Sequence, residues 1–204
     1  MLKRMGIAFG MMATLALANH AFAGDHAHAC CEKASANNAW CSGCKVGFFD
    51  GEKMTCNNLH TALAGMKVDA AKAQCDGCKK AIASNGTCDH CKVSVADGVA
   101  YKSPVAYALM VGTPMEAEKA AAMCKDCGAA CKSGGWCSEC KVGFVAGRMY
   151  KGEEQYKAAK DAHQTLVNAI KACDKCEGCA VAMVTNGTCA QCKVSFENGK
   201  KKAA

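Results

Sequence analysis

The chain has 204 residues, a formal net charge of +7 and 19 cysteines. Aromatic residues make up only 6% of it, so the apolar core must be thin and covalent or metal cross-links are expected to hold the fold. This composition disfavours a large catalytic α/β domain, a coiled coil and a protein with several membrane spans.

The first 23 residues predict a secretory signal peptide. Lys3 and Arg4 give it a basic start, an apolar run covers 5–18, and residues 21–23 read Ala-Phe-Ala, which is typical of a cleavage site. Cleavage there would release a mature chain of residues 24–204 into the periplasm or the medium. Because no second long apolar segment follows, we expect no membrane span in the mature chain.

Gly24, Asp25 and His26 would then form the new N-terminus. A free amine, two backbone nitrogens and an imidazole at the third position make a square-planar ligand set, and this start resembles the amino-terminal copper- and nickel-binding motif. A solvated tail that happens to contain histidines is the alternative interpretation. The copper or nickel site depends on the cleavage point.

Four copies of one cysteine pattern follow. Each has two C-x-x-C pairs separated by nine residues, and the second pair is followed by Lys-Val. In the first copy His28 stands where the other copies have their first cysteine, although Cys30 could replace it. The sixteen predicted metal ligands are His28, Cys31, Cys41 and Cys44; Cys75, Cys78, Cys88 and Cys91; Cys124, Cys127, Cys137 and Cys140; and Cys176, Cys179, Cys189 and Cys192.

The copies alternate in type, which predicts a tandem duplication. Copies one and three have Trp before the third ligand, whereas copies two and four have Asn-Gly-Thr. The expected domains are unit one at 24–112, with modules at 28–50 and 75–98, and unit two at 113–204, with modules at 124–147 and 176–199. Apolar residues at helical spacing predict a helix between the modules of each unit, and Thr113-Pro114-Met115-Glu116 predicts a helix start.

Two C-x-x-C turns joined by a short hairpin would bring four ligands into a tetrahedron, the geometry of thiolate-bound zinc. Pairs such as Asn85-Gly86, which lie between the cysteine pairs, favour a two-residue hairpin turn. The module resembles zinc-ribbon repeats of the double zinc-ribbon type, but Lys45, Lys92, Lys141 and Lys193 stand where such ribbons usually carry glycine. The resemblance implies a metal-stabilised fold and says little about activity. We therefore expect a small metal-stapled α+β fold: four zinc-ribbon-like β-hairpin modules in two tandem units with intervening helices.

Other cysteine chemistries compete with this interpretation. Trp-Cys-x-x-Cys-Lys at 40–45 and 136–141 resembles the thioredoxin redox motif, but residues 34–38 do not read as the buried strand that should precede it. Haem attachment needs C-x-x-C-H, which no copy has, so no haem is expected. A disulfide framework stays open as an alternative, because exported proteins meet oxidising conditions.

The pattern predicts about four zinc ions per chain and leaves four spare thiols, Cys30, Cys56, Cys131 and Cys173. The spare thiols favour an exported metal-binding protein that sequesters or buffers zinc or other heavy metals, such as copper or cadmium, in the cell envelope. The alternatives are an interaction scaffold with structural zinc ribbons and an unknown protein partner, or a thiol–disulfide redox protein. The sequence shows no catalytic constellation, so we do not expect an enzyme. Metal-bound thiolates would cancel the basic charge, so we expect no nucleic-acid partner.

Overall fold

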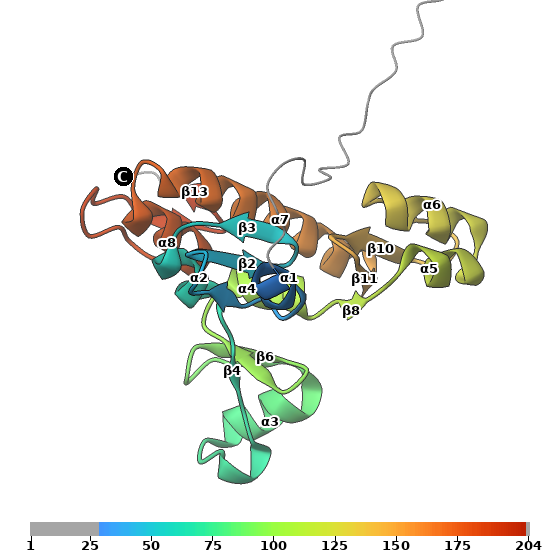
Figure 1. The fold of residues 1–204 in the computed structure, drawn as a ribbon. Helices are drawn as coiled ribbons and strands as arrows, with labels where there is room; N and C mark the ends of the chain where they lie inside the picture. The colour runs from blue at the N-terminus through green and yellow to red at the C-terminus, as the bar shows by residue number, and fades with distance from the viewer. Residues whose placement is uncertain (1–28, 203–204) are drawn as a thin grey trace, which may run out of the picture.

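The computed structural model describes residues 29–202 (Figure 1). The predicted signal peptide, the Gly24-Asp25-His26 site and His28 all lie outside the described residues. Between residues 29 and 202, eight α-helices and several small antiparallel sheets give an α+β fold. No helix in this range is long and apolar enough to cross a membrane.

Short elements alternate along the chain. The helices are α1 (Ala29–Ala36), α2 (Asn57–Leu63), α3 (Asp76–Ser84), α4 (Pro104–Met110), α5 (Ala117–Met123), α6 (Lys125–Ser133), α7 (Glu153–Cys173) and α8 (Glu177–Thr185), with a 3-10 turn η1 (Ala70–Lys72). The strands are β1 (Trp40–Cys41), β2 (Val46–Phe49), β3 (Glu52–Met54), β4 (Met66–Lys67), β5 (Thr87–Cys88), β6 (Val93–Ala96), β7 (Val99–Tyr101), β8 (Thr113–Pro114), β9 (Trp136–Cys137), β10 (Val142–Val145), β11 (Arg148–Lys151), β12 (Phe196–Glu197) and β13 (Lys200–Lys201).

In each module a helix, not a hairpin, joins the two cysteine pairs, so our expectation of a hairpin there is wrong. Helices α1, α3, α6 and α8 occupy this place. The turn residues between the pairs end these helices instead: Asn85, Gly134 and Asn186 are left-handed C-caps with φ of 52°, 69° and 52°. The physical reason is that Asn and Gly tolerate the left-handed conformation equally well in a helix cap and in a hairpin turn.

The hairpin of each module follows the second cysteine pair. Its two-residue turn has positive φ at both positions, as in Asp97-Gly98 with 49° and 74°, which matches a type I′ turn. The equivalent turns are Asp50-Gly51, Ala146-Gly147 and Asn198-Gly199. The amide oxygen of Asn85 accepts the backbone N–H of Asp97 at 2.9 Å, which fastens the helix end to the hairpin turn.

The segment that precedes a module adds an edge strand to its sheet. β4 pairs with β7 and β8 pairs with β11, so the second and third modules have four-stranded sheets of the same order. The predicted helix start at Thr113-Pro114 is therefore wrong. Met149 pairs with Thr113 in the sheet, and α5 begins at Ala117 with Glu116 as N-cap, because the strand pairing keeps 113–114 extended.

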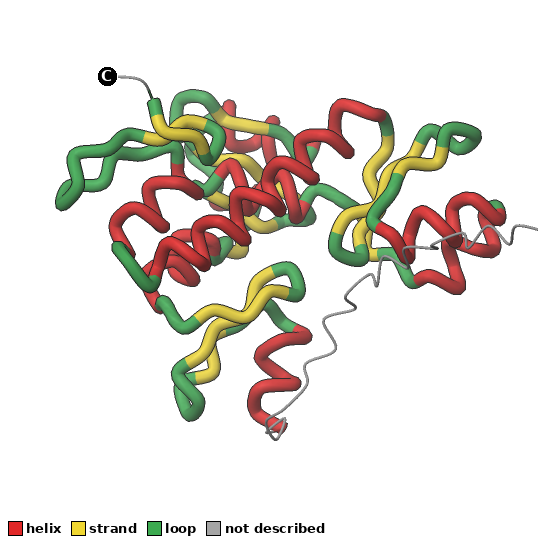
Figure 2. Tube along the Cα trace, turned by 90° about the horizontal axis from the view of Figure 1, so that it is seen from above, coloured by secondary structure: helices red, strands yellow, loops and turns green. Residues whose placement is uncertain are grey.

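A central core joins the two halves of the chain. Buried side chains of α2, α4, α7 and α8 form it, among them Leu59, Leu109, Leu166 and Val184, each 0% exposed. Each cysteine module has a separate small core of its own. The second module, around α3 and β6, and the third, around α5 and α6, extend away from the central helices (Figure 1), and the tube view shows the sheets of these two modules separated from one another (Figure 2). The metal ligands therefore lie outside the central core.

Candidate metal centres

Four groups of four cysteines bring their sulfurs together. Within each group all four Sγ atoms lie within 4.8 Å of one another. The groups are Cys30, Cys31, Cys41 and Cys44; Cys75, Cys78, Cys88 and Cys91; Cys124, Cys127, Cys137 and Cys140; and Cys176, Cys179, Cys189 and Cys192. Fifteen of these are cysteines that the spacing predicts as ligands, and the sixteenth is Cys30.

The sulfur separations fit a shared metal ion. The Sγ atoms of Cys75 and Cys88 are 3.7 Å apart, and those of Cys124 and Cys137 are 3.6 Å apart. Four thiolates at a zinc–sulfur distance of about 2.3 Å define a tetrahedron whose edge is about 3.8 Å. All 19 cysteines are in the free form. The four clusters therefore suit four metal ions with sulfur-rich coordination.

The first cluster contains Cys30, which the sequence pattern left as a spare thiol. Cys30 Sγ lies 3.6 Å from Cys44 Sγ, and both belong to the four-sulfur group. Cys30 and Cys31 stand in the first turn of α1, so both thiols reach the same cluster. The predicted ligand role of His28 stays a prediction, because that residue is outside the described range.

Helix N-termini supply the first cysteine pair in the other three modules. Cys75, Cys124 and Cys176 are the N-caps of α3, α6 and α8. The backbone N–H of Cys127 donates to Cys124 Sγ at 3.2 Å. At the same position of the second module, the backbone N–H of Cys78 together with the Cys88 side chain lowers the pKa of Cys75 to about 6. The backbone N–H of Cys127 likewise lowers the pKa of Cys124, so Cys75 and Cys124 favour the thiolate, the form that binds metal.

The C-x-x-C turn that holds the second cysteine pair of a module, called the knuckle from here on, has its own backbone N–H donors. The backbone N–H of Cys91 donates to Cys88 Sγ at 3.5 Å, and that of Cys192 donates to Cys189 Sγ at 3.4 Å. The second of these bonds, with burial opposing it, lowers the pKa of Cys189 to about 7. Lysine follows each second cysteine pair with positive φ, 53° at Lys92, a conformation that glycine adopts more readily.

The remaining thiols of a cluster resist ionisation without a cation. Hydrogen bonds from Cys91 and Cys88, followed by burial, raise the pKa of Cys78 to about 12. Burial is the main reason why the pKa of Cys179 also rises to about 12. Four adjacent thiolates repel one another, and a divalent ion removes that cost. Without a metal, each cluster is therefore expected to hold a mixture of thiols and thiolates. A bound divalent ion would deprotonate all four.

Exposure differs within each cluster. The third ligands are buried: Cys41 is 6% exposed, Cys88 2%, Cys137 1% and Cys189 1%. By contrast, Cys30, Cys91 and Cys192 are exposed. One side of these clusters is thus anchored in the small core of its module, while another faces solvent.

The other three predicted spare thiols lie in apolar surroundings. Cys56 belongs to the central core and caps α2 by accepting the Leu59 N–H at 3.4 Å. Cys173 packs against the same core, and Cys131 packs against the core of the third module. Burial raises the pKa of both Cys173 and Cys131. Among the described residues these thiols belong to none of the four-sulfur groups.

Sequence reasoning gave His90 no role, yet it lies beside the second cluster. Its Nδ1 is 3.7 Å from Cys91 Sγ and 4.0 Å from Cys75 Sγ. The signal in the sequence is a histidine inside a C-x-x-C pair, a position that excludes haem attachment but not contact with the metal centre.

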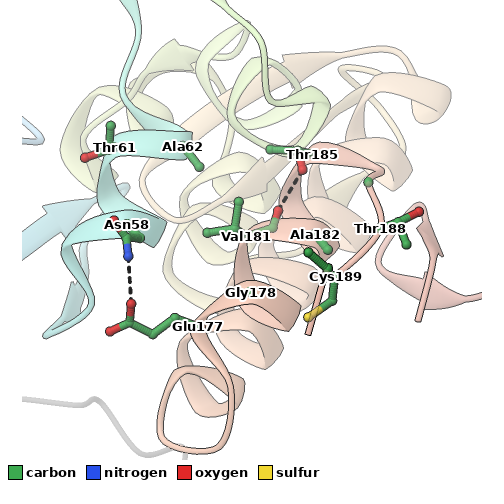
Figure 3. Close-up of a pocket in the computed structure, with 12 residues that line it drawn as sticks. Asn58, Thr61, Ala62, Glu177, Gly178, Val181, Ala182, Thr185, Thr188 and Cys189 are labelled. Carbon is green, nitrogen blue, oxygen red and sulfur yellow. Dashed lines mark hydrogen bonds between the residues drawn. The ribbon is translucent and has the colours of Figure 1, made fainter. Parts of the chain in front are cut away.

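A groove of about 490 Å³ lies between α2 and the fourth module (Figure 3). Asn58 Nδ2 donates to Glu177 Oε2 at 2.7 Å across it, and Cys189 forms part of its wall. Glu177 and Cys189 are the only ionisable residues in its lining. The groove therefore lies at the interface between α2, in the first half of the chain, and the fourth module.

Comparison with family models, with curated proteins and with solved structures finds no match for this chain. Among the described residues, the four cysteine clusters are therefore the feature that points to a function.

Proposed function

We propose that this chain is a metal-binding protein that holds about four zinc ions and buffers or sequesters zinc or related heavy-metal ions. The observation that carries the proposal is the partly open position of the clusters. The clustered cysteines lie outside the central core, although α8, the helix of the fourth module, is also a core helix. Cys30, Cys91 and Cys192 are exposed. Thiolates favour zinc and other soft ions over magnesium or calcium.

Open clusters outside the central core support exchange of metal. An incoming thiolate can approach an ion most easily where a ligand sulfur already faces solvent. The core of α2, α4, α7 and α8 contains none of the sixteen clustered cysteines. The chain is therefore expected to lose and regain ions while its central helices stay folded.

The cell envelope is the proposed location, and residues 1–23 are the support for it. Export would also create the proposed copper or nickel site at Gly24, Asp25 and His26. N-terminal sequencing of protein recovered from the producing cells tests both, because a start other than Gly24 removes that site.

An interaction scaffold with structural zinc is the second candidate. The buried ligands favour it, since Cys88 packs with Ala81 and Val95 in the small core of its module. In a scaffold, metal removal would unfold all four modules and the ions would exchange only on unfolding.

Elemental analysis and thiol titration of one reduced sample, followed by chelation, distinguish the candidates. A buffer should hold about four ions and transfer them to a chelator while far-ultraviolet circular dichroism keeps the signal of the central helices. A scaffold should transfer them only as that signal collapses. A sample with no metal and no free thiols would contradict both and indicate a disulfide protein.

A further inference from the structure

The third residue of the C-x-x-C knuckle differs in every module: it is Gly43, His90, Glu139 or Gln191. In two modules the contacts of this side chain with the cluster are clear. His90 Nδ1 lies 4.0 Å from Cys75 Sγ, and Gln191 Oε1 lies 3.6 Å from Cys176 Sγ. Cys75 and Cys176 are equivalent N-cap cysteines, so one position in the module places different donors against the same ligand.

The position of His90 is close to that of a ligand. Nitrogen and sulfur ligands of a tetrahedral zinc ion are about 3.6 Å apart, given bonds of about 2.05 Å and 2.3 Å. His90 Nδ1 is 3.7 Å from Cys91 Sγ and 4.0 Å from Cys75 Sγ. His90 and Cys91 are both exposed, whereas Cys88 is buried. The imidazole thus lies at the solvent side of the cluster, beside the thiol most free to leave.

We propose that His90 is a reserve ligand of the second metal centre, which takes the place of Cys91 when that thiolate leaves the ion. This inference rests on the proposed metal-binding function. The step is a ligand substitution without change of oxidation state: the metal–sulfur bond to Cys91 breaks and a metal–nitrogen bond to neutral His90 forms. The released Cys91 thiolate takes a proton from water. The second centre can then hand over metal stepwise while three sulfurs and one nitrogen still hold it.

The fourth module is a matched control. Cys192 is exposed like Cys91 and follows Gln191, whose amide oxygen is a poor ligand for a soft ion. When Cys192 leaves, no equivalent donor replaces it. Loss of the last knuckle cysteine should therefore weaken the fourth centre more than the second.

Cadmium-113 bound to the full chain is a suitable probe, because each centre gives its own resonance and nitrogen ligands shift it. In competition with a chelator, Cys91→Ala should retain its second ion at least about tenfold more tightly than Cys192→Ala retains its fourth. The second resonance should move to the region of three sulfurs and one nitrogen. The double variant Cys91→Ala/His90→Ala should lose this advantage. Equal affinities in the two single variants, or no loss in the double variant, would overturn the proposal.

A second variant keeps the test decisive if removal of Cys91 disturbs folding. His90→Gln leaves all four sulfurs in place and gives the second knuckle the same residue as the fourth. Decay of the second resonance during transfer to excess chelator should slow towards that of the fourth centre. An unchanged rate would overturn the role of His90 while four bound ions still support the proposed function. A wild-type chain without cadmium at any cluster would overturn that function and this inference with it.

Discussion

Arg148 Nε lies 3.3 Å from Asp50 Oδ1; the Asp50 side chain is 3% exposed and that of Arg148 is 14% exposed. Asp50 stands in the hairpin turn of the first module, and Arg148 begins β11 of the third. The same guanidinium donates to the carbonyl oxygen of Gly112 at 2.7 Å, just after α4. A single buried ion pair thus fixes the first and third modules to one another and to the central helices.

Replacement of Arg148 should strongly reduce the stability of the folded chain at neutral pH. Burial raises the pKa of Asp50 to about 6 although Arg148 lowers it, so the native state binds this proton more tightly than the unfolded chain. Arg148→Met should lower the free energy of unfolding by about 3–5 kcal/mol at pH 7. The loss should shrink as the pH falls through 6, because protonation removes the unpaired charge.

Urea unfolding of the zinc-loaded chain at pH 7 and pH 5.5 measures this effect. The double variant Asp50→Asn/Arg148→Met should recover most of the stability at pH 7. A penalty for Arg148→Met that grows as the pH falls would show that the pair does not behave as described.

Cys88→Ser should unfold the second module alone. Cys88 is buried with Val95 and Ala100 in a small core that has few other large side chains, and structural zinc contributes on the order of 10 kcal/mol of apparent binding energy. Backbone amide resonances of α3 and β6 should collapse while those of α7 persist, and the ion count should fall from four to three. Cys131→Ser is the control and should keep four ions. Four ions in Cys88→Ser would contradict the assignment.

Cys30→Ser and His28→Ala separate the two candidate ligands of the first centre. Because Cys30 Sγ lies 3.6 Å from Cys44 Sγ, Cys30→Ser should weaken metal binding there on the order of tenfold or more. His28→Ala should have the smaller effect if Cys30 supplies the fourth sulfur. Chelator competition followed by cobalt absorption measures both, and the reverse order would restore His28 as the ligand.

Alkylation should divide the thiols into three groups. In the metal-loaded chain, clustered cysteines are protected by their ions, and Cys56 is protected by burial. Cys131 and Cys173 should react slowly, because burial raises the pKa of each and leaves little thiolate. Mass spectrometry of digested protein reads out each site. Rapid labelling of Cys56 in the folded chain would show that the central core opens more easily than its packing indicates.

Lys92→Gly should stabilise the second module. Lys92 has a φ of 53°, a conformation that costs a non-glycine residue roughly 1–2 kcal/mol, and glycine relieves most of that cost. An increase of about 1 kcal/mol in the free energy of unfolding is expected. Lys79→Gly, inside α3, is the matched control and should destabilise instead. Equal effects of the two substitutions would indicate that the knuckle is not strained.

The grouping of Cys75, Cys78, Cys88 and Cys91 could be predicted from residue spacing, because a C-x-x-C pair directs both thiols to one point whatever surrounds it. The helix between the pairs could not, since Asn85-Gly86 suits a helix cap as well as a hairpin turn. That choice depends on Ala81, which is 2% exposed and packs inside the module.

Contacts between segments far apart in the chain could not be predicted, because no short stretch of the sequence indicates them. The burial of Cys56 in the central core and the pairing of Asp50 with Arg148 both follow from how the modules and the central helices pack together. Cys30, by contrast, joins the first cluster from α1 of its own module. Short-range spacing fixes which thiols can share an ion, because few bonds separate them. Packing of helices far apart in the chain determines which of the remaining polar groups become buried, and that depends on surfaces which no single segment contains.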